Sequence, residues 1–172
     1  MSFRGGLRAR LVRQSFCRML YDSLDTLGWF DSGKQYQYPV TFTTEPIDLT
    51  GNVPLNTLSV SDDDLYQEDV ELGSQLGEYR TMYFIDFFGE SPALSLHMSR
   101  DINDILVGRY EDIGRIASVF DVYDYTQATP TVIFTCQIED VVTMKSQEST
   151  KPFEKNWYSI RLFVVDTYGV DD

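Results

Sequence analysis

Residues 78–108 read EYRTMYFIDFFGESPALSLHMSRDINDILVG, and this stretch decides the fold class. Its first part, 78–88, is aromatic and β-branched and predicts a long strand. The turn 89–92 ends that strand, and Ser91 followed by Pro92 is a typical helix start, with Ser91 as the cap. A helix over 92–108 is therefore predicted, ending near Gly108, and its apolar face holds Leu94, Met98, Ile102, Ile105 and Leu106.

A second helix of about five turns is predicted at the N-terminus, because apolar residues recur there at near-helical intervals. Gly28 supplies its stop, and the large apolar residues Trp29 and Phe30 are expected to hold the helix end in the core. The apolar stripe of this helix begins near Leu7 and consists of Leu11, Phe16, Leu20, Leu24 and Leu27.

Three closing strands are predicted at 119–125, 131–142 and 157–168, and short β stretches at 40–44 and 53–60 are interrupted by prolines. The expected fold is a single α+β domain over 1–172, long enough to bury its own core. It has an antiparallel sheet of about four main strands, flanked by the two helices, and a short irregular β region. The acidic stretch 61–77 is expected to be a mobile, solvated loop.

Charge is distributed unevenly along the chain. The formal net charge is −13, yet residues 1–28 carry five arginines against two acids and are basic. A basic helix joined to an acidic body indicates a surface that meets another charged surface, because opposed potentials steer association. These groups supply the candidate interface residues: Arg4, Arg8, Arg10, Arg13 and Arg18, with Asp62, Asp63, Asp64, Glu68, Asp69 and Glu71.

Each of these two groups also has a plainer interpretation. The arginines can be solvated helix-face residues, and an Arg-rich, acid-poor N-terminus is also typical of a mitochondrial transit peptide. Asp22, Asp25 and the continuing apolar stripe favour folded structure instead. The run 62–64 could offer oxygens to a hard cation, but it lacks the glycine and bidentate Glu of an EF-hand loop, so a solvated loop is favoured.

No residue pattern predicts a reaction, a metal site or a cofactor. His97 is the single histidine, and Cys17 and Cys136 lie far apart without a second ligand pair. The acidity disfavours binding to free DNA. The run 82–88 is apolar on both faces of its strand, which indicates core burial on one face and a neighbouring element or subunit on the other. It is broken by Asp86 and is too short to span a bilayer.

The order of these segments resembles the tail terminator proteins of long-tailed, siphovirus-type bacteriophages. The resemblance covers most of the chain apart from 61–77. It rests on the N-terminal helix ending at 27–30, the central strand 78–88, the capped helix 91–108 and the three closing strands. The resemblance implies a structural virion protein without catalysis or cofactor, assembled in the host cytoplasm and located at the junction between tail and neck.

It also implies the partners of such a protein. The chain would form a homo-hexameric ring that caps the tail tube and joins a stopper or connector protein of the head and neck. An acid-lined lumen would let DNA pass without binding. Other phage neck or tail proteins, namely stopper, adaptor and tube subunits, are the nearest alternatives. From another class, an acidic accessory module that binds a basic partner remains open, and an enzyme ranks third.

Overall fold

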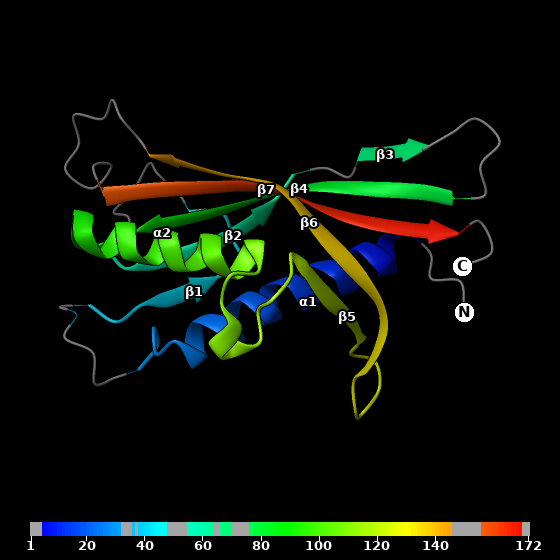
Figure 1. Ribbon diagram of the computed structural model, residues 1–172, viewed down its shortest axis with the longest axis horizontal. Coiled ribbons are helices and arrows are strands. Elements are labelled where there is room, and N and C mark those ends of the chain that lie inside the picture. Colours follow the sequence, from blue (N-terminus) through cyan, green and yellow to red (C-terminus); the bar gives the residue numbers. More distant parts are fainter. Residues whose placement is uncertain are drawn as a thin grey trace.

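Two helices and seven strands make up the part of the chain that the computed structural model describes, residues 5–31, 36, 38–47, 55–63, 66–69, 76–145 and 156–169. The N-terminal helix is α1 (Gly5–Thr26), and Figure 1 shows the elements along the chain. The elements that follow are β1 (Thr41–Thr43), β2 (Thr57–Asp62), β3 (Tyr66–Asp69), β4 (Leu76–Phe88), α2 (Pro92–Val107), the 3-10 turn η1 (Glu111–Ile113), β5 (Val119–Asp124), β6 (Thr131–Lys145) and β7 (Trp157–Gly169).

The described strands form one sheet in the order β1-β2-β4-β7-β6-β5, with β3 paired to β4 beside this path. Its centre is the antiparallel pair of β4 and β7, which runs from Leu76 opposite Gly169 to Phe88 opposite Trp157. The pair of β1 and β2 is parallel, and the other pairs are antiparallel. The α+β prediction is confirmed, while the prediction of about four antiparallel strands is only roughly correct, since the sheet is larger and mixed.

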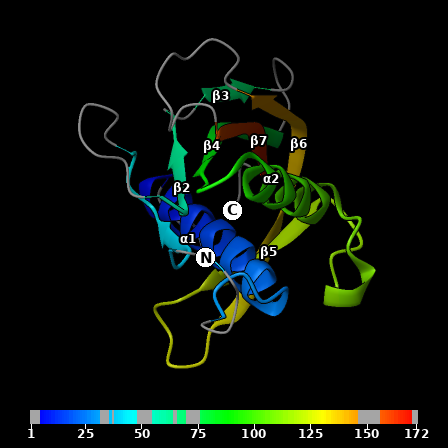
Figure 2. The same cartoon turned by 90° about the vertical axis from the view of Figure 1, so that its left-hand side faces the viewer.

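The sheet curls around the two helices, as Figure 2 shows along the long axis of the molecule. There α2 lies against the concave side under β4, β7 and β6, and α1 crosses the open side between β2 and β5. The backbone amide of Tyr123 in β5 donates to the Ser15 hydroxyl of α1 at 3.0 Å. Helix α1 therefore covers the edge of the sheet at β5, which would otherwise present unpaired backbone groups.

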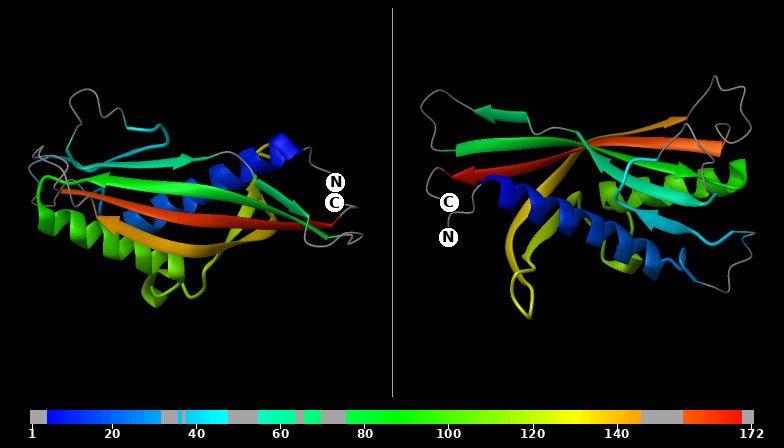
Figure 3. Two further views of the ribbon diagram at one scale, coloured as in Figure 1. Left: turned by 90° about the horizontal axis from the view of Figure 1, so that it is seen from above. Right: turned by 180° about the vertical axis from the view of Figure 1, so that it is seen from behind.

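One end of the sheet extends past α2. Figure 3 shows β3 and the adjacent ends of β4 and β7 lying beyond the part of the sheet that α2 covers. Register explains this, because β6 pairs with β7 only from Gln137 opposite Val165 onward, and its earlier residues turn away to pair with β5. The part of β7 after Val165 therefore leaves the helix-covered core, and α1 is the helix that lies beside it.

The core forms where the apolar stripes of both helices meet the inner face of the sheet. The predicted stripe of α1 is confirmed: Leu11, Phe16, Leu20 and Leu24 are at most 2% exposed, while Leu27 is only partly buried. Every residue of the predicted α2 stripe is buried as well. The inner face of the sheet contributes alternate residues of β4 and β7, as the period of two in a strand requires: Tyr83, Ile85, Phe87, Ile160, Leu162 and Val164.

The helix ends lie where the capping signals place them. The Ser91 hydroxyl accepts from the Leu94 backbone amide at 3.2 Å, and Gly108 ends α2 with a φ of 73°. Gly28, with a φ of 78°, follows α1. Trp29 is buried behind it and donates from Nε1 to the Asp101 carboxylate of α2 at 2.7 Å. The predicted anchoring of the α1 end is thus confirmed.

The predicted loop over 61–77 is wrong in part. Its first two residues belong to β2, its last two belong to β4, and residues 66–69 form β3. The backbone of β3 pairs with β4 from Tyr66 opposite Arg80 to Asp69 opposite Gly77. Backbone pairing of this kind forms hydrogen bonds whichever side chains the strand carries. The acidic composition of 66–69 therefore did not reveal strand β3. Residues 64, 65 and 70–75 lie outside the described residues.

Candidate functional site

The predicted interface arginines do not form one exposed group. Arg8 is only 8% exposed and forms a bidentate ion pair with Asp166 of β7, from Nε to Oδ2 and from Nη2 to Oδ1 at 2.7 Å. Its guanidinium also lies over the ring of Phe134, 3.7 Å from the ring centroid. The expectation of an exposed Arg8 is therefore wrong. The signal was in the spacing, because Arg8 lies three and four residues before the buried Leu11 and Val12.

Two of the predicted residues pair with each other. Arg13 of α1 lies 3.2 Å from the carboxylate of Asp62 at the end of β2, and its Nη2 donates to the backbone carbonyl of Thr44 at 2.8 Å. Both side chains are partly exposed, so the pair contributes at most about 1 kcal/mol to stability. The Arg13–Asp62 pair fixes the position of α1: together with the hydrogen bond between Ser15 and Tyr123 of β5, it holds α1 across the open side of the sheet.

The other candidates are distributed over the surface or lie outside the described residues. Arg18 pairs with Asp22 one turn later at 3.1 Å, and Arg10 is exposed without an ion pair in the described part of the chain. Asp63 is exposed, and its backbone amide donates to Met82 at 2.9 Å. Glu68 and Asp69 are placed by their backbone in β3. Arg4, Asp64 and Glu71 belong to the residues that the structure does not describe.

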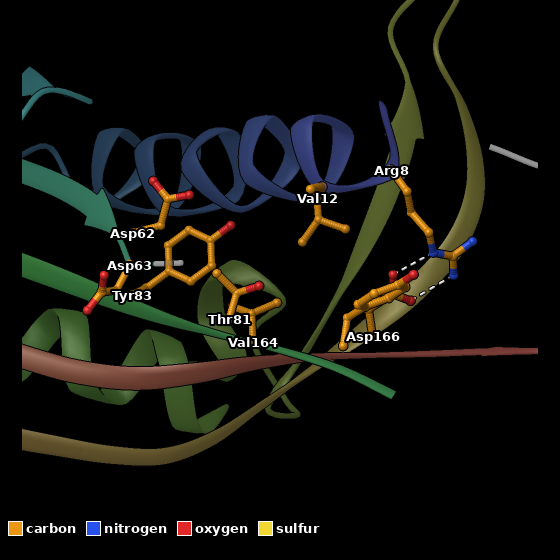
Figure 4. A pocket seen from close by; sticks show the side chains of 10 residues that line it. Arg8, Val12, Asp62, Asp63, Thr81, Tyr83, Val164 and Asp166 are labelled. Carbon is orange, nitrogen blue, oxygen red and sulfur yellow. Dashed lines mark hydrogen bonds and ion pairs between the residues drawn. The ribbon is translucent and has the colours of Figure 1, made fainter. Parts of the chain in front are cut away.

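A cavity of about 180 Å³ lies between the first turns of α1 and the strands β2, β4 and β7. Figure 4 shows the Arg8–Asp166 pair closing one end and Tyr83 with Asp62 at the other. Burial raises the pKa of the Tyr83 hydroxyl far above its ordinary value, and the nearby Asp62 carboxylate adds to this. Tyr83 thus stays a neutral hydroxyl at physiological pH. Sequence reasoning missed the role of Asp166, although a carboxylate directly after Val164 and Val165 in a buried strand needs a partner.

Within the described residues, the two cysteines and the histidine do not form a catalytic or metal-binding group. Cys17 and Cys136 are buried free thiols, and burial raises the pKa of Cys17 to about 11 and that of Cys136 further. Neither is a thiolate at neutral pH, which is the form that attacks or binds metal. His97 is exposed on α2. Within the described residues, no group of three or more His, Cys, Asp or Glu side chains could hold a metal ion.

The convex face of the sheet is the second feature of interest. On β4, β6 and β7 the residues that alternate with the buried inner ones point away from both helices, and no described helix covers them (Figures 1 and 2). We call the following set the outer face: Met82, Phe84, Asp86, Glu139, Val142, Met144, Trp157, Arg161 and Phe163. Val142 and Met144 are each 41% exposed, and the other apolar members are partly buried.

Charged side chains lie among the apolar ones, namely Asp86, Glu139 and Arg161. Arg161 of β7 is flanked by Phe84 on β4 and Val142 on β6. Its Nε is buried and has no hydrogen-bond acceptor within the described residues. A buried donor without an acceptor costs about 1–3 kcal/mol.

No model of a known protein family matches this chain, and a search of curated proteins finds no relative of it. No helix within the described residues is both long and apolar enough to cross a membrane.

Proposed function

We propose that this chain is a structural subunit of a long-tailed bacteriophage virion, a tail terminator that closes as a hexameric ring on the end of the tail tube. The observation that carries the proposal is the order of elements. A helix ended by Gly28 and Trp29 precedes a long central strand, a helix capped by Ser91 and three closing strands. This is the order on which the resemblance to terminator proteins rests.

The uncovered outer face supports a subunit with a permanent neighbour. A sheet face that carries Phe84, Val142 and Met144 and that no described element covers is typical of a surface that another protein covers. In a ring, each subunit uses one surface to contact the next copy and a different surface to contact the previous one. A protein of this kind performs no catalysis and needs no cofactor; its work is to hold the tube end and the neck stopper or connector together.

The charge of the chain fits a ring through which DNA passes. A net charge of −13 repels a duplex, because binding depends on basic side chains that neutralise phosphates. DNA could then move through the lumen without being retained. We place the protein at the tail and neck junction of the virion, after assembly in the host cytoplasm.

Two measurements test this proposal together. Native mass spectrometry of the purified chain is expected to show a hexamer, and antibody labelling of whole virions is expected to mark one site between head and tail. Labelling along the whole tube would identify a tube subunit instead. A chain that is monomeric in solution and absent from virions would contradict the proposal and would favour the acidic accessory module.

A further inference from the structure

The cavity between α1 and the strands β2, β4 and β7 contains a buried hydroxyl that has no hydrogen-bond partner in the described part of the chain. Tyr83 of β4 is only 1% exposed, and it lines this cavity of about 180 Å³. Figure 4 shows its ring at one end of the cavity, with the hydroxyl directed toward α1. The nearby carboxylate of Asp62 acts on this hydroxyl through its charge and not through a hydrogen bond. Because buried hydroxyls normally have a partner, the cavity is the place from which one would come.

The fold holds the Tyr83 hydroxyl in this position. The ring centroid of Tyr83 lies 4.8 Å from that of Phe16 in α1, a fully buried side chain. The backbone of Tyr83 is paired on both sides, opposite Asp62 of β2 and Leu162 of β7. The ring therefore cannot turn the hydroxyl out to solvent. Since burial keeps this hydroxyl neutral, it can both donate and accept a hydrogen bond.

The walls between the two ends of the cavity are largely apolar. Ala9 and Val12 of α1 line it on one side, and Val164 of β7 and the Tyr83 ring line it on the other (Figure 4), while Thr81 of β4 adds a second hydroxyl. A water molecule is held well only where about two to four polar groups surround it, and the middle of the cavity does not provide them. An apolar cavity of about 150 Å³ holds a benzene molecule, so 180 Å³ suits a molecule of benzene size that carries one further group.

The charged groups around the cavity are balanced in pairs. Arg8 and Asp166 neutralise each other at one end, and Asp62 at the other end lies 3.2 Å from Arg13. Asp63 also lines the cavity, but it is exposed, so water hydrates its charge. Among the described residues, an ion inside the cavity would therefore meet no buried opposite charge that is left over, and its own desolvation would not be offset. These walls favour an uncharged molecule.

We propose that this cavity is a binding site for a small uncharged molecule that has an apolar body of about benzene size and one hydroxyl or carbonyl group. The apolar body lies between Val12 and Val164, and the polar group forms a hydrogen bond with the Tyr83 hydroxyl. Burial of the apolar body drives binding, while the hydrogen bond selects for the polar group. The cavity lies within a single chain, so this site does not depend on the proposed ring.

The first test compares phenol with toluene, two uncharged molecules of the same shape that differ by a hydroxyl in place of a methyl group. Isothermal titration calorimetry on the full chain should give a Kd of about 1 mM or tighter for phenol. Phenol should bind about two- to tenfold more tightly than toluene, because one net hydrogen bond contributes that much.

Two substitutions and a matched control assign the binding to the cavity. Tyr83→Phe removes only the hydroxyl, so the affinity for phenol should fall to that for toluene, and toluene binding should not weaken. Ala9→Leu fills part of the cavity and should abolish the binding of both molecules. The control Ala93→Leu changes an exposed alanine of α2 outside the cavity and should leave both affinities unchanged.

Folding and the position of the ligand are measured separately. Circular dichroism and urea unfolding establish that each variant is folded. NMR spectra of the wild-type chain locate the ligand, since the backbone amides of Thr81, Tyr83 and Val164 should shift when phenol is added, whereas that of Ala93 should not. If Ala9→Leu does not fold, these shifts and the Tyr83→Phe comparison decide.

Several outcomes would overturn the inference. A wild-type chain that does not bind phenol at about 10 mM would show that the cavity takes up water only. Equal affinities of the wild type for phenol and toluene would show that the Tyr83 hydroxyl does not select the ligand. Phenol binding that persists in Ala9→Leu, or amide shifts confined to residues outside the cavity, would place the ligand elsewhere. None of these outcomes bears on the proposed ring, which native mass spectrometry and antibody labelling of virions test separately.

Discussion

Replacing Asp166 with alanine is expected to lower the free energy of unfolding by about 3–5 kcal/mol. The side chains of Arg8 and Asp166 are only 9% and 6% exposed, and both carboxylate oxygens accept from the guanidinium. Asp166→Ala leaves the Arg8 charge in a buried site without this carboxylate, so its desolvation is no longer offset. Because a domain of this kind is stable by about 5–15 kcal/mol in total, the loss would be a large fraction of its stability.

The double variant Arg8→Met, Asp166→Leu is expected to regain most of this loss, since replacing both charges of a buried pair by apolar groups is often neutral. Urea unfolding followed by tryptophan fluorescence, with linear extrapolation, measures each variant. The control is Asp22→Ala, which breaks the exposed Arg18–Asp22 pair and should leave the free energy of unfolding nearly unchanged, because solvent screens this pair. Equal losses in Asp166→Ala and Asp22→Ala would refute the assignment of a tightly buried pair.

Three further predictions concern packing, backbone strain and pH. Leu24→Ala should lower the free energy of unfolding by about 2–5 kcal/mol, because Leu24 is fully buried. The control Arg10→Ala should change it by no more than about 0.5 kcal/mol. Urea unfolding measures both, and equal losses in the two variants would contradict the prediction. Gly108→Ala should lower the melting temperature more than Gly114→Ala, since both have positive φ but only Gly108 lacks room for a Cβ. Burial raises the pKa of Cys17 to about 11, so the stability that its neutral thiol contributes is present below its ordinary pKa of 9.0 and is lost as pH rises to 11. Cys17→Ala should therefore lose less stability than wild type between pH 9 and 11.

Several elements could be predicted from short stretches of sequence because their signals are local. The cap at Ser91, the stop at Gly108 and the apolar stripes of both helices depend on residues within about four positions of one another. The strand over 78–88 was recognisable from its residue types in the same way. Strand β3 was not, because its pairing with β4 joins backbone groups and does not depend on the side chains of residues 66–69.

The candidate site was predictable only as a list of charged residues. Arg13 and Asp62 are both on that list and do meet, but Arg8 joins Asp166, 158 positions away in the chain, and is thereby removed from the surface. The outer face was partly foreseen, since 82–88 is apolar on both faces of its strand. Which face stays uncovered could not be foreseen, because it depends on the side where both helices pack.

Local sequence therefore decides the kinds of elements and their order, since helix caps, apolar periods and turn residues act over a few neighbouring positions. The packing of segments that are far apart in the chain decides which side chains are exposed on the surface. The curl of the sheet, the position of α1 between β2 and β5, and the exposure of Val142, Met144 and Ile116 all follow from contacts between segments far apart in the chain. Such contacts are selected by the burial of the whole core, which no single stretch of sequence contains.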